Sequence, residues 1–202
     1  EIDRLLKKVD KKLKKSIDIA YSRIKIFHSK QKFYNFKYRD KYKNELSYRY
    51  SPIERIGVYV PGGTASYPST VLMNCIPALV AGVKNIYLTT PALGKTINPA
   101  IIYAAKKCGV REIYKTGGAH SIAAFTFGTK TFKKVNKIVG PGNIYVARSK
   151  REVFGDVGTE GMVAGPSEIC VLADGKTDLN QVITSMIGQA EHDVNSQCIL
   201  IT

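Results

Sequence analysis

A unit of strand, glycine turn and helix recurs along this chain, and it is the feature that most limits how the chain can fold. The first strand, at 55–60, alternates isoleucine and valine with other residues and runs into a turn of one proline and two glycines at 61–63. An apolar stretch at 69–81 follows and is typical of a helix. Strands that alternate with helices in this way favour a mostly parallel α/β sheet with right-handed crossovers and helices on both faces.

Three further units follow the first one. The expected strands lie at 85–90, 111–115 and 137–139, and the expected helices at 100–108, 121–127 and 144–153. Because the carboxyl ends of parallel strands share one edge of the sheet, the glycine turns at 117–118 and 140–143 should meet there, where open α/β sheets bind ligands. Helix starts at such turns offer unpaired N–H groups to an anion, although a single glycine turn is more often a plain connection.

The N-terminal region has a different pattern. Apolar residues between Ile2 and Phe27 recur at steps of three and four, which predicts one long amphipathic helix with lysines on its opposite face. Residues 30–54 mix aromatic and charged side chains without a clear period, so we expect an irregular or β-rich connector wrapped on the surface. Pro52 marks a boundary before the first strand of the sheet.

Positive charge is concentrated in this N-terminal region. The chain carries a net charge of +15, and residues 1–55 hold 17 Lys and Arg against 7 Asp and Glu, which leaves a net charge of only +5 for the rest. A basic surface of that size could attract RNA or an acidic partner. No nucleic-acid motif accompanies the charge, so we interpret it as a solvated helix face and expect no nucleic-acid binding.

Cysteine usage and hydropathy indicate a cytoplasmic protein. The longest apolar stretch, at 71–83, is too short and too interrupted to span a membrane. The four cysteines form no CxxC pair, which favours buried free thiols in a reducing cytosol over disulfides or a zinc–thiolate site. They are Cys75, Cys108, Cys170 and Cys198. The chain begins without Met and ends inside an expected strand at 197–202, so we expect it to be part of a longer protein.

The sequence of the C-terminal part predicts one more strand, followed by a helix. A loop is expected at 154–163, a strand at 169–173, and a helix from 179 to about 192 that Asp178 can cap. Gln189 and His192 lie three residues apart on this helix and therefore share one face. They could bind a metal, with His as the commoner ligand and Gln as a weak oxygen donor, but spacing alone favours a structural role.

Six segments together resemble the histidinol dehydrogenase family. They are RIGVYVPGG at 55–63, STVLM at 69–73, GGA at 117–119, KIVGPGN at 137–143, AGPSE at 164–168 and QAEH at 189–192. Each segment alone is a weak signal, but all six occur in order along the chain. The resemblance implies oxidation of L-histidinol through an aldehyde to L-histidine, with two NAD consumed and zinc required.

The resemblance also implies roles for particular residues. Tyr59, His120 and Asn143 correspond to positions that contact NAD in the family, although His120 stands where the family typically has Gln. A histidine also donates a hydrogen bond, but it can gain a charge near the cofactor. The family's cofactor domain is an incomplete Rossmann-like sheet without the usual GxGxxG sequence, and this chain lacks that sequence as well.

Three further positions are assigned by the resemblance. Ser167 corresponds to a substrate-binding position, and Gln189 and His192 correspond to two zinc ligands that thereby also hold the substrate. The metal would fix the imidazole and amino nitrogens of L-histidinol and place its alcohol carbon for hydride transfer. The segment 160–163 differs from the family's usual Ile-Asp-containing run, which alters the expected substrate wall.

By the resemblance, the chain would divide into three segments that belong to two domains. Residues 1–57 and 168–202 would belong to one discontinuous α/β domain, and residues 58–167 would form the inserted NAD-binding domain. The general-base Glu-His pair and two further zinc ligands of the family are expected beyond Thr202, and the complete protein is expected to be a homodimer. The alternative is a non-catalytic homologue that uses its basic N-terminal region to bind RNA or an acidic partner.

Overall fold

The structure is a computed structural model that describes residues 2–62, 67–92, 96–160, 168–191 and 196–202. The chain forms two compact units, the N-terminal unit Glu1–Gly161 and the C-terminal unit Met162–Thr202. The division of the chain into domains 1–57, 58–167 and 168–202 stays a prediction.

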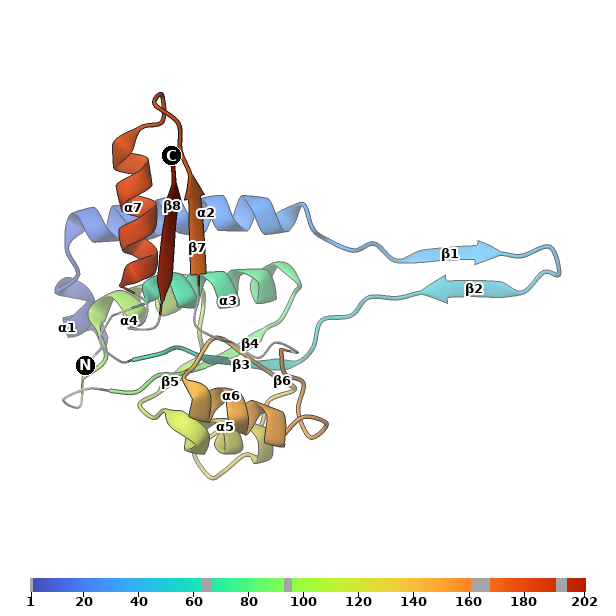
Figure 1. Ribbon diagram of the computed structural model, residues 1–202. Coiled ribbons are helices and arrows are strands. Elements are labelled where there is room, and N and C mark those ends of the chain that lie inside the picture. The colour runs from blue at the N-terminus through green and yellow to red at the C-terminus, as the bar shows by residue number, and fades with distance from the viewer. Residues whose placement is uncertain (1, 63–66, 93–95, 161–167, 192–195) are drawn as a thin grey trace. The chain divides into compact units, whose positions relative to one another are not determined.

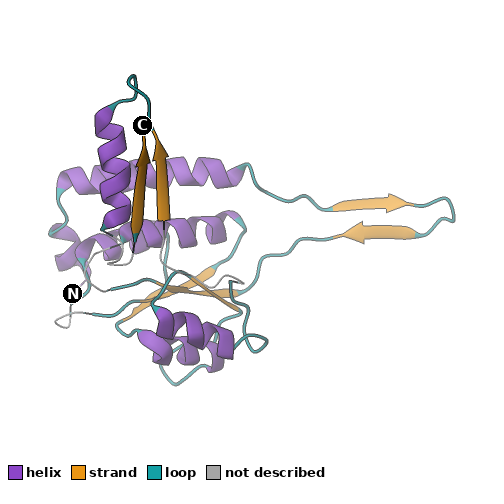
Figure 2. Ribbon diagram, viewed as in Figure 1, coloured by secondary structure: helices purple, strands orange, loops and turns teal. Residues whose placement is uncertain are grey.

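A four-stranded parallel sheet forms the centre of the N-terminal unit. Its strands are β3 (Arg55–Tyr59), β4 (Asn85–Thr89), β5 (Glu112–Tyr114) and β6 (Lys137–Val139). They lie in the order β5-β4-β3-β6, and every neighbouring pair is parallel. Figure 2 shows these strands between helices on both faces. The predicted parallel α/β sheet is therefore confirmed, with strand ends within two residues of the expected positions.

Helices cover both faces of this sheet and bury an apolar core on each. On one face lie α3 (Pro68–Val80) and α4 (Pro99–Lys107), and on the other lie α5 (Gly118–Phe127) and α6 (Ile144–Glu152) (Figure 1). Val58 of β3 packs in the first core, and the neighbouring Tyr59 packs in the second. Because strand side chains alternate between faces, a strand covered on both sides is apolar at nearly every position.

The N-terminal region forms two helices, so the prediction of one long helix is wrong. The helices are α1 (Ile2–Lys7) and α2 (Lys11–Ser29). Asp10 interrupts the pattern because its carboxylate accepts hydrogen bonds from the backbone N–H groups of Lys12, at 2.7 Å, and Leu13, at 3.1 Å. An N-cap of this kind satisfies the first N–H groups of a helix and favours a start at that point. The break lets both Leu5 and Ile17 reach the core of α3 and α4.

The segment after α2 is a β-hairpin. It pairs β1 (Phe36–Arg39) with β2 (Glu45–Tyr48) in antiparallel register, with Phe36 opposite Tyr48. The expectation of a β-rich connector is confirmed, but the segment is not wrapped on the surface. All eight strand residues are exposed, and Figure 1 shows the hairpin extending away from the sheet and helices of its unit.

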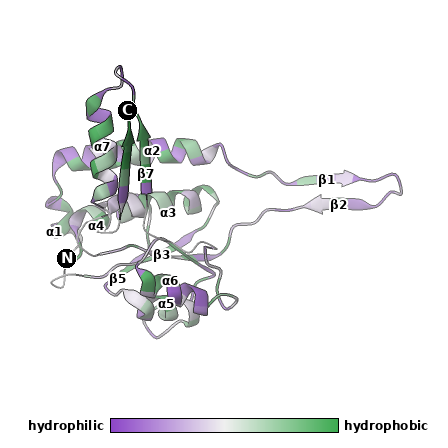
Figure 3. Ribbon diagram, viewed as in Figure 1, coloured by the Kyte–Doolittle hydropathy of each residue, from purple (hydrophilic) through white to green (hydrophobic). Residues whose placement is uncertain are grey.

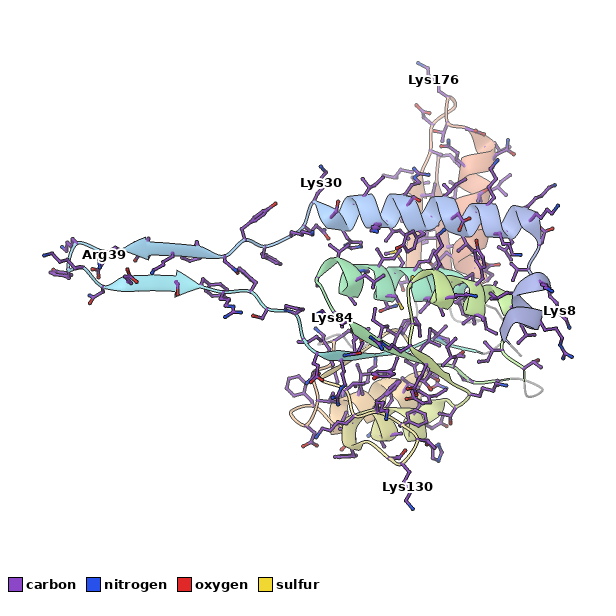
Figure 4. The ribbon with its side chains drawn as sticks, turned by 180° about the vertical axis from the view of Figure 1, so that it is seen from behind. Lys8, Lys30, Arg39, Lys84, Lys130 and Lys176 are labelled. Carbon is purple, nitrogen blue, oxygen red and sulfur yellow. The ribbon has the colours of Figure 1, made fainter. Side chains whose placement is uncertain are left out.

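Basic side chains of the N-terminal region point into solvent. Lys8 follows α1, Lys30 follows α2 and Arg39 lies in the hairpin, and all three residues are exposed (Figure 4). On the hairpin, Lys37 forms an ion pair of 2.5 Å with Glu45 on the strand opposite. The interpretation of the charge as a solvated surface agrees with this exposure.

The C-terminal unit is a strand–helix–strand unit. Its elements are β7 (Glu168–Leu172), α7 (Leu179–Ala190) and β8 (Gln197–Ile201), and the two strands are parallel. Asp178 caps α7, because its carboxylate accepts from the N–H of Asn180 at 2.9 Å, as predicted. Both strands are mainly hydrophobic (Figure 3), yet Leu172 of β7 is 75% exposed and Ile201 of β8 is 50% exposed.

The four cysteines are free thiols, but they are not all buried. Cys75 and Cys108 are buried, and interaction with the Cys108 thiol together with burial raises the pKa of the Cys75 thiol well above its ordinary value. Cys198 is partly buried, and Cys170 is exposed, which corrects the expectation for that residue. Within the described residues, no helix is both long and apolar enough to cross a membrane.

Candidate functional site

The carboxyl edge of the parallel sheet gathers the loops that follow its four strands. After β3 comes Gly62, where an added Cβ atom would lie 2.6 Å from the carbonyl oxygen of Pro91, in the loop after β4. After β5 comes Gly117, where an added Cβ would overlap the ring of the same proline. The loops approach each other so closely that only glycine fits at these two positions. The glycine turns therefore meet at one edge, as the sequence predicted.

Tyr59 links the end of β3 to the start of α5. Its side chain is buried, and its hydroxyl oxygen accepts a hydrogen bond of 3.1 Å from the backbone N–H of Gly118. Gly118 begins α5 with a φ of 66°, a left-handed conformation that glycine adopts without strain. A phenol can also donate a hydrogen bond. Because Gly118 uses the acceptor side of the hydroxyl, its proton can be offered to a ligand.

The backbone of Tyr59 also contacts the loop after β6. Gly140 in that loop has a φ of 107°, and an added Cβ there would overlap the carbonyl oxygen of Tyr59. Both the conformation and the contact require glycine. Tyr59 is therefore held between the loop after β5, through its hydroxyl, and the loop after β6, through its main chain.

Asn143 caps the helix that follows this loop. Its side-chain oxygen accepts a hydrogen bond of 3.1 Å from the backbone N–H of Val146, and the residue is exposed at the start of α6. The N–H groups in the first turn of a helix lack partners within the helix, and the positive end of the helix dipole lies there. The start of α6 can therefore attract an anionic group of a ligand at this edge.

His120 lies in the first turn of α5 and is exposed. The structure thus brings the three predicted NAD contacts to the same edge of the sheet. Tyr59 lies at the end of the central strand β3, and His120 and Asn143 lie at the starts of α5 and α6. That these side chains contact NAD stays a prediction. The glycine-lined loops and the two helix starts fit a dinucleotide, whose pyrophosphate needs close backbone approach and N–H donors.

Two residues at this edge were missed by the sequence reasoning. Lys150 of α6 is only 8% exposed and forms an ion pair of 2.5 Å with Glu160. Its Nζ also donates a hydrogen bond of 2.5 Å to the carbonyl oxygen of Gly140, and the N–H of Gly140 donates to the carboxylate of Glu160. A signal was present in the sequence, because Lys150 falls four residues after the buried Val146, on the apolar face of α6.

The two predicted zinc ligands, Gln189 and His192, belong to the C-terminal unit. Of the two, Gln189 lies within the described residues. This residue lies near the end of α7, and its amide nitrogen is buried without a hydrogen-bond partner among the described residues. Ser167 and His192 lie outside the described residues. Within those residues, no group of three or more His, Cys, Asp or Glu side chains could hold a metal ion. A histidine nitrogen is a common zinc ligand, and Gln189 would bind zinc through its amide oxygen, which carries the lone pairs. Its buried amide nitrogen is a hydrogen-bond donor whose acceptor is not among the described residues.

The parallel sheet, its glycine-lined carboxyl edge and the helix starts along that edge define a partial Rossmann-like ligand-binding fold. Comparison with known sequences identifies a family within this class. The sequence model of the family described as histidinol dehydrogenase matches residues 1–202. The chain belongs to the histidinol dehydrogenase family. The resemblance inferred from six segments is thereby confirmed, and it extends over the whole chain.

Individual relatives agree with this assignment. The chain is 56% identical to histidinol dehydrogenase of Pelagibacter ubique, over 100% of this chain and 47% of the relative. It is 51% identical to the enzyme of Mesorhizobium japonicum, over 96% of this chain and 45% of the relative. A crystal structure of histidinol dehydrogenase from Elizabethkingia anophelis is similar with a TM-score of 0.89 and 43% identity, over 98% of this chain and 46% of that one. The chain thus spans a little under half the length of these relatives.

Proposed function

We propose that the protein containing this chain is a zinc- and NAD-dependent histidinol dehydrogenase. It would oxidise L-histidinol to L-histidinal and then to L-histidine, with one hydride passing to NAD in each step and water supplying the second carboxylate oxygen. The observation that carries this proposal is family membership over all 202 residues, together with the gathering of Tyr59, His120 and Asn143 at one sheet edge. The product would serve histidine biosynthesis.

The carboxyl edge of the sheet is the proposed NAD site. Tyr59 offers a hydroxyl whose position is fixed by Gly118, and Asn143 can donate from its amide nitrogen while its oxygen caps α6. The N–H groups at the start of α6 would face the pyrophosphate. His120 would take the place of the family's usual Gln and donate one hydrogen bond from its imidazole.

The C-terminal unit is proposed to supply two zinc ligands, Gln189 and His192, and a substrate contact, Ser167. Zinc bound there would act as a Lewis acid that holds the imidazole and amino nitrogens of L-histidinol. The chain contributes the position of one of these donors: α7 carries Gln189 near its end, and zinc would bind the amide oxygen of that side chain. The general-base Glu-His pair and the remaining ligands are expected in the sequence that follows Thr202 in the family.

The assembly and location of the protein are proposed from the family pattern. The complete protein would be a cytoplasmic homodimer, with residues 1–57 and 168–202 in one discontinuous domain and residues 58–167 inserted as the NAD-binding domain. Exposed apolar side chains on β7 and β8, such as Leu172 and Ile201, support a C-terminal unit that gains further packing in the complete domain.

The test is NADH formation by the protein expressed from its complete coding sequence. We expect turnover with L-histidinol and two NADH for each substrate molecule, loss of activity on chelation, and recovery with zinc. Gln189→Ala and His192→Ala should lower both zinc content and turnover. A folded complete protein without L-histidinol-dependent NADH formation would contradict the proposal and favour the non-catalytic binding protein.

A further inference from the structure

Lys150 and Glu160 enclose the backbone of Gly140, and we call these three residues the Gly140 clamp. Lys150 donates to the carbonyl oxygen of Gly140, Glu160 accepts from its N–H, and the two side chains form an ion pair of 2.5 Å with each other. Both polar groups of one peptide residue are therefore fixed by side chains ten or more residues away. Because both the N–H and the carbonyl oxygen of Gly140 are bonded to side chains, the peptide groups on either side of this residue are held in place.

The burial of Lys150 restricts its ammonium group to these two partners. The Lys150 side chain is 9% exposed and that of Glu160 is 35% exposed. A buried ammonium group is costly unless it is paired and hydrogen-bonded, and Lys150 has both an ion pair and a carbonyl partner. An apolar residue at position 150 would extend the stripe of Val146 and Val153, and packing alone does not call for a charge there.

The clamp acts on the loop that leads to the proposed NAD site. Gly140 lies against the carbonyl oxygen of Tyr59, and three residues later Asn143 caps α6. Fixing both polar groups of Gly140 sets the direction in which the chain leaves β6. That direction determines where Asn143 and the first N–H groups of α6 face, because the loop between them is only two residues long.

We propose that Lys150 and Glu160 are positioning residues for NAD binding, which hold the 140–143 loop in the conformation that receives the dinucleotide. The inference rests on the proposed function of this edge. The proposal also gives the charge of Lys150 a role. Because its ammonium group pairs with Glu160 and donates to the carbonyl of Gly140, it orders the loop and does not serve as a direct phosphate ligand. Neither side chain is a catalytic residue in this account.

The test compares NAD binding and kinetics of variants in the complete protein. Lys150→Met keeps the length of the side chain and removes its charge, and Glu160→Gln removes the other charge with almost no change of shape. The matched control is Arg151→Met, which removes the same charge from the next position of α6, where the side chain is exposed. Lys150→Arg restores a cation and serves as the conservative rescue variant.

We expect Lys150→Met to raise both the Kd and the KM for NAD at least tenfold, with the KM for L-histidinol and the zinc content within twofold of wild type. Glu160→Gln should raise the same two NAD constants in the same direction. The double variant should be no worse than Lys150→Met, since the two residues act as one unit. Lys150→Arg should recover part of the NAD affinity, and Arg151→Met should match wild type.

The outcomes separate this inference from the proposed function. NAD affinity within twofold of wild type in both folded Lys150→Met and Glu160→Gln would overturn the role of the clamp while leaving the enzyme assignment intact. A lower thermal midpoint without a change in the KM for NAD would also overturn it, since the pair would then be merely structural. Failure of the wild-type protein to bind NAD would refute the proposed function itself. If Lys150→Met does not fold, Glu160→Gln decides the question.

Discussion

The hydroxyl of Tyr59 accepts a hydrogen bond of 3.1 Å from the backbone N–H of Gly118, and this bond joins the end of β3 to the start of α5. The two residues are 59 positions apart in the chain. Their bond fixes the orientation of a buried phenol at the edge where parallel α/β sheets bind ligands. It also occupies an N–H group that the first turn of a helix leaves without a helical partner.

Replacement of Tyr59 by Phe should weaken NAD binding with little change of the fold. The variant keeps the ring in the core but removes the acceptor of Gly118, which costs about 1–3 kcal/mol for a donor left unsatisfied in a partly buried place. We expect a rise of about fivefold or more in the Kd for NAD, measured by titration. An unchanged Kd would show that the hydroxyl does not take part in the site.

Gly140 should tolerate no side chain, and Gly155 provides the control. Both glycines have nearly the same φ, 107° and 104°, but an added Cβ meets the carbonyl of Tyr59 at position 140 and nothing within 4 Å at position 155. Gly155→Ala should therefore cost only the conformational strain, roughly 1–2 kcal/mol. Gly140→Ala should cost more, because the strand end must also shift.

Thermal unfolding of the two variants measures the difference. The midpoint of Gly140→Ala should lie clearly below that of Gly155→Ala, and NAD affinity should fall only in the former. Equal midpoints would mean that the loop after β6 moves away from Tyr59 without cost.

Gly57 of β3 makes room for Phe125 of α5. An added Cβ would lie 2.8 Å from the ring, so Gly57→Ala should destabilise the protein by about 1–3 kcal/mol through overpacking. Phe125→Leu in the same protein should relieve part of that cost, giving a favourable coupling in a double-mutant cycle. Purely additive losses of unfolding free energy would argue against a direct clash.

Tyr114 should ionise only at high pH. Burial, followed by its hydrogen bond to Glu112, raises the pKa of Tyr114 to about 12. An unfolded tyrosine ionises near pH 10, so this residue's contribution to stability is complete below about pH 10 and is lost as the pH rises toward 12. The absorbance titration of wild type minus that of Tyr114→Phe should show a midpoint near pH 12. A midpoint near pH 10 would contradict the described environment.

The sheet could be predicted from sequence because its strands are covered on both faces. Strands such as Asn85–Thr89 then carry consecutive apolar residues, here at 86–88, and their parallel order follows from the helices between them. The break in the first helix was missed because Asp10 falls between apolar residues that keep a helical period on either side. Only its capping bonds to Lys12 and Leu13 identify it as a helix start.

The site was predictable in part. The edge itself follows from the glycine turns, whereas the individual roles of Tyr59, His120 and Asn143 came from the family resemblance. Lys150 and Glu160 were not found, because they are ten positions apart and the helix and loop between them must fold before the pair meets around Gly140. Periodicity reports which face of a helix is buried, but it does not report which buried cation has a partner.

Hydrogen–deuterium exchange of the complete protein with and without saturating NAD tests the placement of the cofactor directly. We expect added protection in the peptides that contain residues 59–62, 117–120 and 140–146, and no change in the exposed hairpin at 36–48, which serves as the internal control. Bound NAD that leaves those three segments unprotected would contradict the placement of the cofactor at the carboxyl edge of the sheet.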